Sequence, residues 1–232
     1  MPSTDYDRLL ENLRLADVVL VEGRTRAAGV VQTVTLSGWS HSLLYVGRFG
    51  ELPEALVDDD VRHACGNDPT SVLLIEAKGG EGVRLVPLAH YAGEHMRLCR
   101  ASRLNAGDAR HVVNYALAHI GAPYDLRHAL DLLRFLVPYR VLPRRWRSTL
   151  FEMGQRDLSA TICSTLIADA FASVRYPVLS TMHRGPGGQP VFHARDSKLI
   201  TPRDFDFSPY FDVIKFPFFA DEVARYRELV WD

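Results

Sequence analysis

The stretch that decides the fold runs Ser40-His-Ser-Leu-Leu-Tyr-Val-Gly47. Its aliphatic and aromatic residues are typical of a β-strand. Successive side chains of a strand point to opposite faces, so His41, Leu43 and Tyr45 share one face. We therefore expect a strand here, with a histidine at the beginning of an otherwise apolar face.

Other strand signals lie on both sides of this stretch. The turn Gly79-Gly-Glu-Gly82 separates two β-rich runs, and glycines permit the positive φ angles of such a turn, so the runs predict a hairpin. We expect strands at residues 17–21, 40–47, 72–77, 83–88, 96–101 and 213–216.

Helical periodicity and capping residues mark the flanking segments. We expect helices at residues 6–15, 25–36, 105–119, 126–137, 164–174 and 220–230. The order of helices, then a block of strands, then helices around Cys163 predicts an α+β fold in one domain, 1–232. The acidic segment 49–70 is expected to be a surface insertion in which His63-Ala-Cys65 is a solvated loop, and residues 185–190 are expected to form another loop.

Composition excludes several classes of protein. Of the 232 residues, 47% are apolar and 24% charged, as in globular proteins. The net charge of −1 gives no broad positive field, so we expect no nucleic-acid partner. Three cysteines are too few for a disulfide framework. With an acidic beginning and no long apolar run, we expect a cytoplasmic protein without a transmembrane segment.

Cys163 is the first candidate for chemistry. It stands in the first turn of an expected helix, where unpaired backbone N–H groups and the helix dipole favour a thiolate. A cysteine here can equally be a small buried apolar residue. The residues that contact Cys163 must distinguish a nucleophile from a buried apolar side chain.

A thiolate nucleophile needs a base and a group that orients the base. His41 is the base candidate, although a histidine on a strand can also be structural. Glu76 interrupts the apolar run 72–77 and can accept from one imidazole nitrogen if its strand lies beside that of His41. The alternative is that Glu76 is solvated at a strand end.

Five motifs together resemble the permuted papain-like cysteine hydrolases of the NlpC superfamily, especially the YiiX/YebB-like group. In this group the histidine strand precedes the cysteine helix, as it does here. The motifs are Leu15-Ala-Asp-Val-Val-Leu-Val21, Thr35-Leu-Ser-Gly-Trp-Ser-His-Ser-Leu-Leu-Tyr-Val-Gly47, Ile75-Glu-Ala77 with Gly82-Val83, Gly121-Ala-Pro-Tyr-Asp125, and Thr161-Ile-Cys-Ser-Thr-Leu-Ile-Ala-Asp-Ala-Phe171.

The resemblance implies a circularly permuted papain-like fold, with an antiparallel sheet or partial barrel packed against helices. It implies that Cys163 is the nucleophile, His41 the base and Glu76 the orienting group, with no cofactor or metal. Tyr124 matches a tyrosine that lines the substrate cleft. In the His41 motif, Trp39 and Ser40 are expected to bind substrate.

Three functions remain open. The first is an amidase or peptidase that cleaves a small peptide or amide through an acyl-thioester. The second is a lipid-directed acyltransferase or thioesterase of the lecithin:retinol acyltransferase-like type, with residues 130–137 lining an acyl groove. The third is an inactive binding module, because Ile162 and Thr165 depart from the aromatic residue and the glutamate that relatives commonly carry around the cysteine.

Other signals favour structural roles. The spacing of His90, His95 and Cys99 does not match a zinc pattern. Arginines at 140–147 could attract an anionic substrate or a phospholipid headgroup, but a solvated connector is the favoured interpretation. The glycines at 185–188 lack the lysine and strand-to-helix context of a phosphate-binding loop. The sequence does not predict the oligomeric state.

Overall fold

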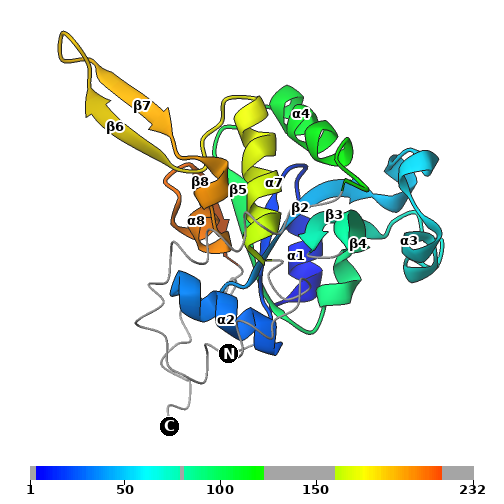
Figure 1. Cartoon of the computed structure of the whole chain (residues 1–232). Helices are drawn as coiled ribbons and strands as arrows, with labels where there is room; N and C mark the ends of the chain where they lie inside the picture. Colours follow the sequence, from blue (N-terminus) through cyan, green and yellow to red (C-terminus); the bar gives the residue numbers. More distant parts are fainter. Residues whose placement is uncertain (1–3, 79–80, 123–159, 216–232) are drawn as a thin grey trace, which may run out of the picture.

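A computed structural model describes residues 4–78, 81–122 and 160–215 of the chain. Its central feature is an open, antiparallel sheet of six strands in the order β4-β3-β2-β1-β5-β8 (Figure 1). The strands are β1 (Val18–Glu22), β2 (His41–Arg48), β3 (Val72–Lys78), β4 (Gly82–Pro87), β5 (His95–Ala101) and β8 (Phe211–Ile214).

Apolar side chains cover both faces of the sheet. On β2, Leu44 and Val46 join the larger core cluster, whereas Leu43 and Tyr45 join the smaller one. The alternation predicted for residues 40–47 is therefore confirmed, but both faces are buried rather than one. This burial explains the nearly continuous apolar runs in the central strands.

Helices supply the remainder of each core. The larger cluster packs against α4 (Ala106–Leu117) and α7 (Ala160–Ser173), and the smaller one takes Leu9 from α1 (Tyr6–Asn12). Figure 1 shows α7 and α4 side by side, and α7 contacts both β2 and β3. This packing brings the beginning of α7 to the beginning of β2.

Side-chain caps explain where several helices begin. Thr25 caps α2 (Arg26–Thr35) by accepting from the backbone N–H of Ala28, and Asn105 caps α4 by accepting from Asp108. Both caps stand where the sequence predicts a helix to begin. The predicted helices at 126–137 and 220–230 lie outside the described residues.

The segment 49–70 is more ordered than its composition suggests. It holds the short 3₁₀ helices η1 (Phe49–Glu51) and η2 (Glu54–Leu56), and α3 (Asp59–Ala64), which Asp58 caps. Val57, Val61 and Cys65 are buried in the larger core cluster. The interpretation of His63-Ala-Cys65 as a solvated loop is therefore wrong for Cys65, because α3 turns this side chain inward.

Two other elements were not expected. Residues 185–190 lie in the turn and first residue of a hairpin formed by β6 (Ser180–Arg184) and β7 (Pro190–Ala194), which projects from the body (Figure 1). The helix α8 (Pro202–Phe207) precedes β8, and it begins with a capping box made by Thr201 and Asp204. None of the helices in the described ranges is long and apolar enough to cross a bilayer.

Candidate active site

Strand pairing brings His41 and Glu76 together. β2 and β3 are antiparallel neighbours, with Leu44 opposite Ile75. His41 Nε2 lies 2.8 Å from Glu76 Oε2. Glu76 is 1% exposed, so the alternative of a solvated carboxylate at a strand end is wrong.

Two further side chains hold Glu76. Arg84 stands directly opposite it on β4, and both Nε and Nη2 of Arg84 lie 2.7 Å from Glu76 Oε1. Tyr91, the last residue of the 3₁₀ helix η3 (Leu88–Tyr91), donates its hydroxyl to Glu76 Oε2 at 2.5 Å. Each oxygen of the buried carboxylate is therefore occupied, which fixes the face it presents to His41.

Cys163 is held on the other side of the imidazole. It is the fourth residue of α7, and its sulfur accepts from the backbone N–H and from the hydroxyl of Ser42, both at 3.3 Å. His41 also hydrogen-bonds Cys163. Because Nε2 faces Glu76, Nδ1 is the ring nitrogen left for the sulfur.

The two partners shift each other's protonation. Burial alone would lower the pKa of His41, but the charge of Cys163, its hydrogen bond and then Glu76 raise that pKa to about 10, from 6.5. Burial alone would raise the pKa of Cys163, but His41 and the two donors of Ser42 lower it. The arrangement therefore favours a thiolate beside an imidazolium at neutral pH.

Glu76 and Tyr91, which support His41, each keep a single protonation state as well. Burial would raise the pKa of Glu76, but His41, Tyr91 and Arg84 outweigh it and lower that pKa. Burial and the charge of Glu76 raise the pKa of Tyr91. Tyr91 therefore remains a hydrogen-bond donor and Glu76 an anion across the working pH range.

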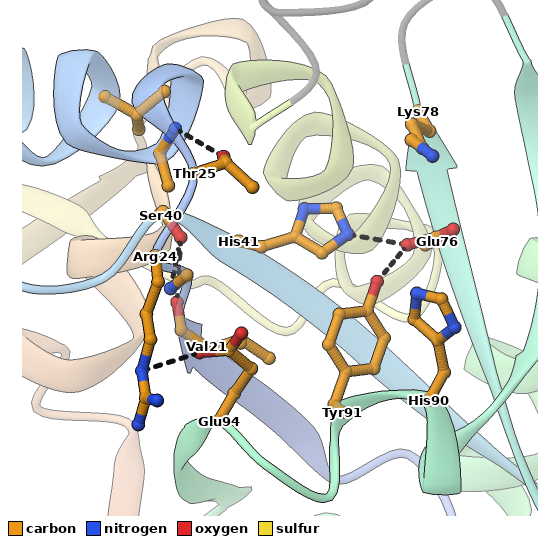
Figure 2. Close-up of a pocket in the computed structure, with 13 residues that line it drawn as sticks. Val21, Arg24, Thr25, Ser40, His41, Glu76, Lys78, His90, Tyr91 and Glu94 are labelled. Atoms are coloured by element: carbon orange, nitrogen blue, oxygen red, sulfur yellow. Dashed lines mark hydrogen bonds and ion pairs between the residues drawn. The ribbon is translucent and has the colours of Figure 1, made fainter.

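A pocket of about 240 Å³ opens beside the imidazole. Figure 2 shows His41, Glu76 and Tyr91 converging on one side of it, opposite the turn that leads into α2. Its other lining residues are Val21, Gly23, Arg24, Thr25, Ala28, Val31, Ser40, Lys78, His90 and Glu94. Cys163 is 1% exposed and is not among the lining residues, so the sulfur does not open onto this pocket.

Ser40 lines the pocket and also shapes it. Its hydroxyl accepts from the backbone N–H of Gly23 at 2.8 Å and donates to the carbonyl of Val21 at 3.1 Å. A Cβ at Gly23 would lie 2.8 Å from this hydroxyl. Glycine is thus required where the chain leaves β1 close to the beginning of β2.

Of the other two expected substrate-binding residues, only Trp39 lies within the described ranges. Trp39 donates from Nε1 to Asp206 at 3.0 Å, stacks on His95 and lies under the guanidinium of Arg97, and it does not line the pocket. Tyr124 lies outside the described residues, as do the arginines at 140–147 and the expected acyl groove at 130–137. Their substrate roles stay predictions.

Three residues at this site were missed by sequence reasoning: Ser42, Arg84 and Tyr91. Arg84 had a usable signal, because the hairpin turn at 79–82 sets residue 84 opposite residue 76. Tyr91 had none, since a 3₁₀ turn after β4 brings it back to the sheet.

The remaining cysteines are structural. Cys99 is fully buried in the larger core, and burial raises its pKa to about 12. Cys65 is buried, and burial raises its pKa as well. None of the three cysteines forms a disulfide. Within the described ranges, no three His, Cys, Asp or Glu side chains gather as a metal site, and this includes His90, His95 and Cys99.

Comparison with known proteins adds a likeness of fold. No protein-family model matches the sequence, and no curated protein matches it. Among solved structures, the crystal structure of the metalloprotein YiiX from Escherichia coli O157:H7 is similar, with a TM-score of 0.50 and 13% identity. The match covers 87% of this chain and 96% of YiiX. The mixed α+β fold, with an antiparallel sheet packed against helices, is therefore similar to that of YiiX.

Proposed function

We propose that this protein is a cysteine hydrolase with a permuted papain-like arrangement, in which Cys163, His41 and Glu76 act together on an amide bond. The observation that carries the proposal is the contact of one imidazole with both a buried carboxylate and a thiol. Glu76 lies on Nε2, and Cys163 takes the opposite side of the ring. This order of groups is that of a nucleophile, a base and an orienting residue.

In the proposed reaction, the Cys163 thiolate attacks the carbonyl carbon, and the carbonyl electron pair moves onto oxygen. Backbone N–H groups in the first turn of α7 stabilise this oxyanion. The His41 imidazolium gives its proton to the leaving nitrogen as the C–N bond breaks, which leaves a thioester. Water then attacks the thioester, His41 takes the water proton, and cleavage of the C–S bond releases the acid.

The pocket favours a small substrate with both apolar and polar groups. A volume of about 240 Å³ holds a short peptide or amide rather than a long acyl chain. Its rim carries Arg24, Lys78 and Glu94 beside the apolar Val21, Ala28 and Val31. Amide hydrolysis is therefore the first choice, and lipid-directed acyl transfer becomes an outcome of the substrate assays.

The proposal requires Cys163 to become reachable when substrate enters, because the sulfur is buried and does not line the pocket. The imidazole itself is partly accessible, with 13% of its side chain exposed. Reactivity towards a small alkylating reagent therefore tests both accessibility and activation.

YiiX is called a metalloprotein, but the residues described here do not fit a metal site. The described ranges contain no group of three ligating side chains, and Glu76 is already occupied by His41, Arg84 and Tyr91.

The test combines labelling and turnover. The protein is treated with iodoacetamide at neutral pH, labelled peptides are mapped, and hydrolysis of peptide amides, short-chain esters and lipid esters is measured. We expect preferential labelling of Cys163, and a loss of turnover of more than about a thousandfold in Cys163→Ala. The matched control Cys99→Ala removes a buried thiol with a raised pKa. This variant should retain both the labelling of Cys163 and the turnover.

Three results decide between the functions. Turnover that survives Cys163→Ala would overturn the proposal. A Cys163 no more reactive than an ordinary thiol would favour a binding module that keeps the fold without activity. Cleavage of lipid esters but not of peptide amides would favour the lipid-directed enzyme.

A further inference from the structure

The hairpin of β6 and β7 forms a projecting arm, which we define as residues 180–194 (Figure 1). Its two strands pair with each other and belong to a separate sheet. The arm is anchored at its base, where Arg195 N–H donates to the carbonyl of Leu179 and Ser180 hydrogen-bonds Tyr210. An isolated two-stranded hairpin gains little stability alone, so a surface to dock on would stabilise it.

One face of the arm carries an exposed apolar pair. Met182 lies directly opposite Phe192, and each is 61% exposed. Both belong to the four large apolar side chains that are most exposed in the described residues. Directly opposed residues on antiparallel strands form one continuous surface, so the pair is a single apolar patch.

The arm carries one arginine, Arg184, and contains no acid. From Arg175 to Arg195 the sequence has no aspartate or glutamate, whereas the whole chain has a net charge of −1. Arg184, at the end of β6, and Arg195, after β7, are both exposed. Arg184 lies on the same face as Met182 and Phe192, because alternate residues of a strand share a face.

The turn keeps the tip narrow. Gly187 and Gly188 have φ angles of +86° and +82°, and Gly185 N–H donates to the carbonyl of Gln189 at 2.9 Å. On the opposite face, the rings of His183 and His193 stack with centroids 4.6 Å apart. The arm therefore presents one apolar, basic face and one histidine face.

We propose that the arm docks on an anionic lipid surface. Met182 and Phe192 beside Arg184 suit the interface of a bilayer, where the apolar groups enter the acyl boundary and the guanidinium meets a lipid phosphate. A second copy of the arm is a poorer partner, because two such faces would bring arginines together with no carboxylate between them. Docking involves none of the residues around Cys163.

Sedimentation of the full chain with vesicles tests the proposal. One set of vesicles contains phosphatidylserine and phosphatidylcholine, and the other phosphatidylcholine alone. We expect binding to the anionic vesicles that weakens as salt is added. The double variant Met182→Ser with Phe192→Ser should bind about tenfold more weakly or worse. Arg184→Gln should weaken binding on the order of fivefold.

The matched control is Leu36→Ser, because Leu36 is 79% exposed and lies at the end of α2, outside the arm. It should bind as the wild type does. Circular dichroism and thermal unfolding check that each variant is folded. Equal vesicle binding by the wild type and the double variant would overturn the proposal, as would no binding to anionic vesicles. Self-association that is lost in the double variant, without vesicle binding, would assign the arm to a second copy instead.

Discussion

Ser42 donates both its backbone N–H and its hydroxyl to the sulfur of Cys163, each at 3.3 Å. The hydroxyl also lies 3.2 Å from that of Ser164, the next residue of α7. Two donors on one sulfur favour its charged form, because hydrogen bonds to an anion are stronger than those to a neutral group. The strand that carries the base therefore also helps to ionise the nucleophile.

Replacement of Ser42 by alanine removes one of these donors and keeps the backbone N–H. We expect Ser42→Ala to raise the pKa of Cys163 and to slow its alkylation at neutral pH about tenfold. The rate of iodoacetamide labelling against pH measures this change. Ser40→Ala is the matched control, since Ser40 bonds Gly23 and Val21 and not the sulfur. An unchanged labelling profile in Ser42→Ala would contradict the assigned role.

The sequence predicts much of this site because its geometry follows from strand pairing. The patterns of residues 40–47 and 72–77 predict that His41 and Glu76 each lie on a strand, and both strands are confirmed. The sequence left it as a condition that the two strands are neighbours, and their pairing meets this condition. Cys163 lies near the beginning of α7, which begins at Ala160, four residues before the predicted helix at 164–174. These features depend on local periodicity, which the sequence displays directly.

Other features depend on contacts between distant segments. Tyr91 reaches Glu76 through a 3₁₀ turn. Trp39 does not line the pocket, because its ring contacts Asp206 and Arg97 instead. Helix α3 was missed because its acidic first turn resembles a loop, although Asp58 caps it. The arm was missed because Gly185 to Pro190 resemble an open loop, and the strands on each side are short and exposed.

Glu76→Gln tests the orienting carboxylate. Glutamine keeps the size of the side chain but removes the charge that helps to raise the pKa of His41. We expect kcat/KM to fall about tenfold to a hundredfold, a milder loss than in Cys163→Ala, because neither reacting group is removed. The alkaline limb of the pH–rate profile should move to lower pH. A limb that stays in place would show that Glu76 does not control the ionisation of His41.

Tyr91→Phe removes the hydroxyl that Glu76 Oε2 shares with His41. We expect a loss of about 0.5–1.5 kcal/mol in the free energy of unfolding. The pKa of Glu76 should rise, and kcat should fall with KM nearly unchanged, since Tyr91 acts through Glu76.

The matched control for Tyr91 is Tyr176→Phe. The hydroxyl of Tyr176 donates to the carbonyl of Ser102 at 3.0 Å, away from the pocket. Tyr176→Phe should lower the free energy of unfolding by a similar amount and leave kcat unchanged. Equal kinetic effects from both variants would assign Tyr91 a purely structural role.

The charge state of Cys163 gives a prediction about pH. Its pKa is lowered, whereas those of Cys65 and Cys99 are raised, so only Cys163 should be a thiolate at neutral pH. The ultraviolet thiolate absorbance of the wild type, minus that of Cys163→Ala, should be present at pH 7. It should disappear only on acidification through the depressed pKa of Cys163. A difference that develops only near the ordinary thiol pKa of 9.0 would contradict the ion pair.

The same pair determines how stability depends on pH. The raised pKa of His41 contributes stability that is complete below 6.5 and lost as pH rises through about 10. The lowered pKa of Cys163 contributes stability that is complete above 9.0 and lost as pH falls through its folded value. Between about 6.5 and 9.0 the two slopes cancel, because the folded and unfolded pairs each hold one proton. The contribution of the pair to the free energy of unfolding should therefore be flat across this window and fall on both sides.

Urea unfolding at a series of pH values measures this contribution. Ser40→Ala, which leaves the pair intact, should show the same plateau. A contribution that changed steadily with pH across the window would mean that only one member of the pair is charged in the folded protein.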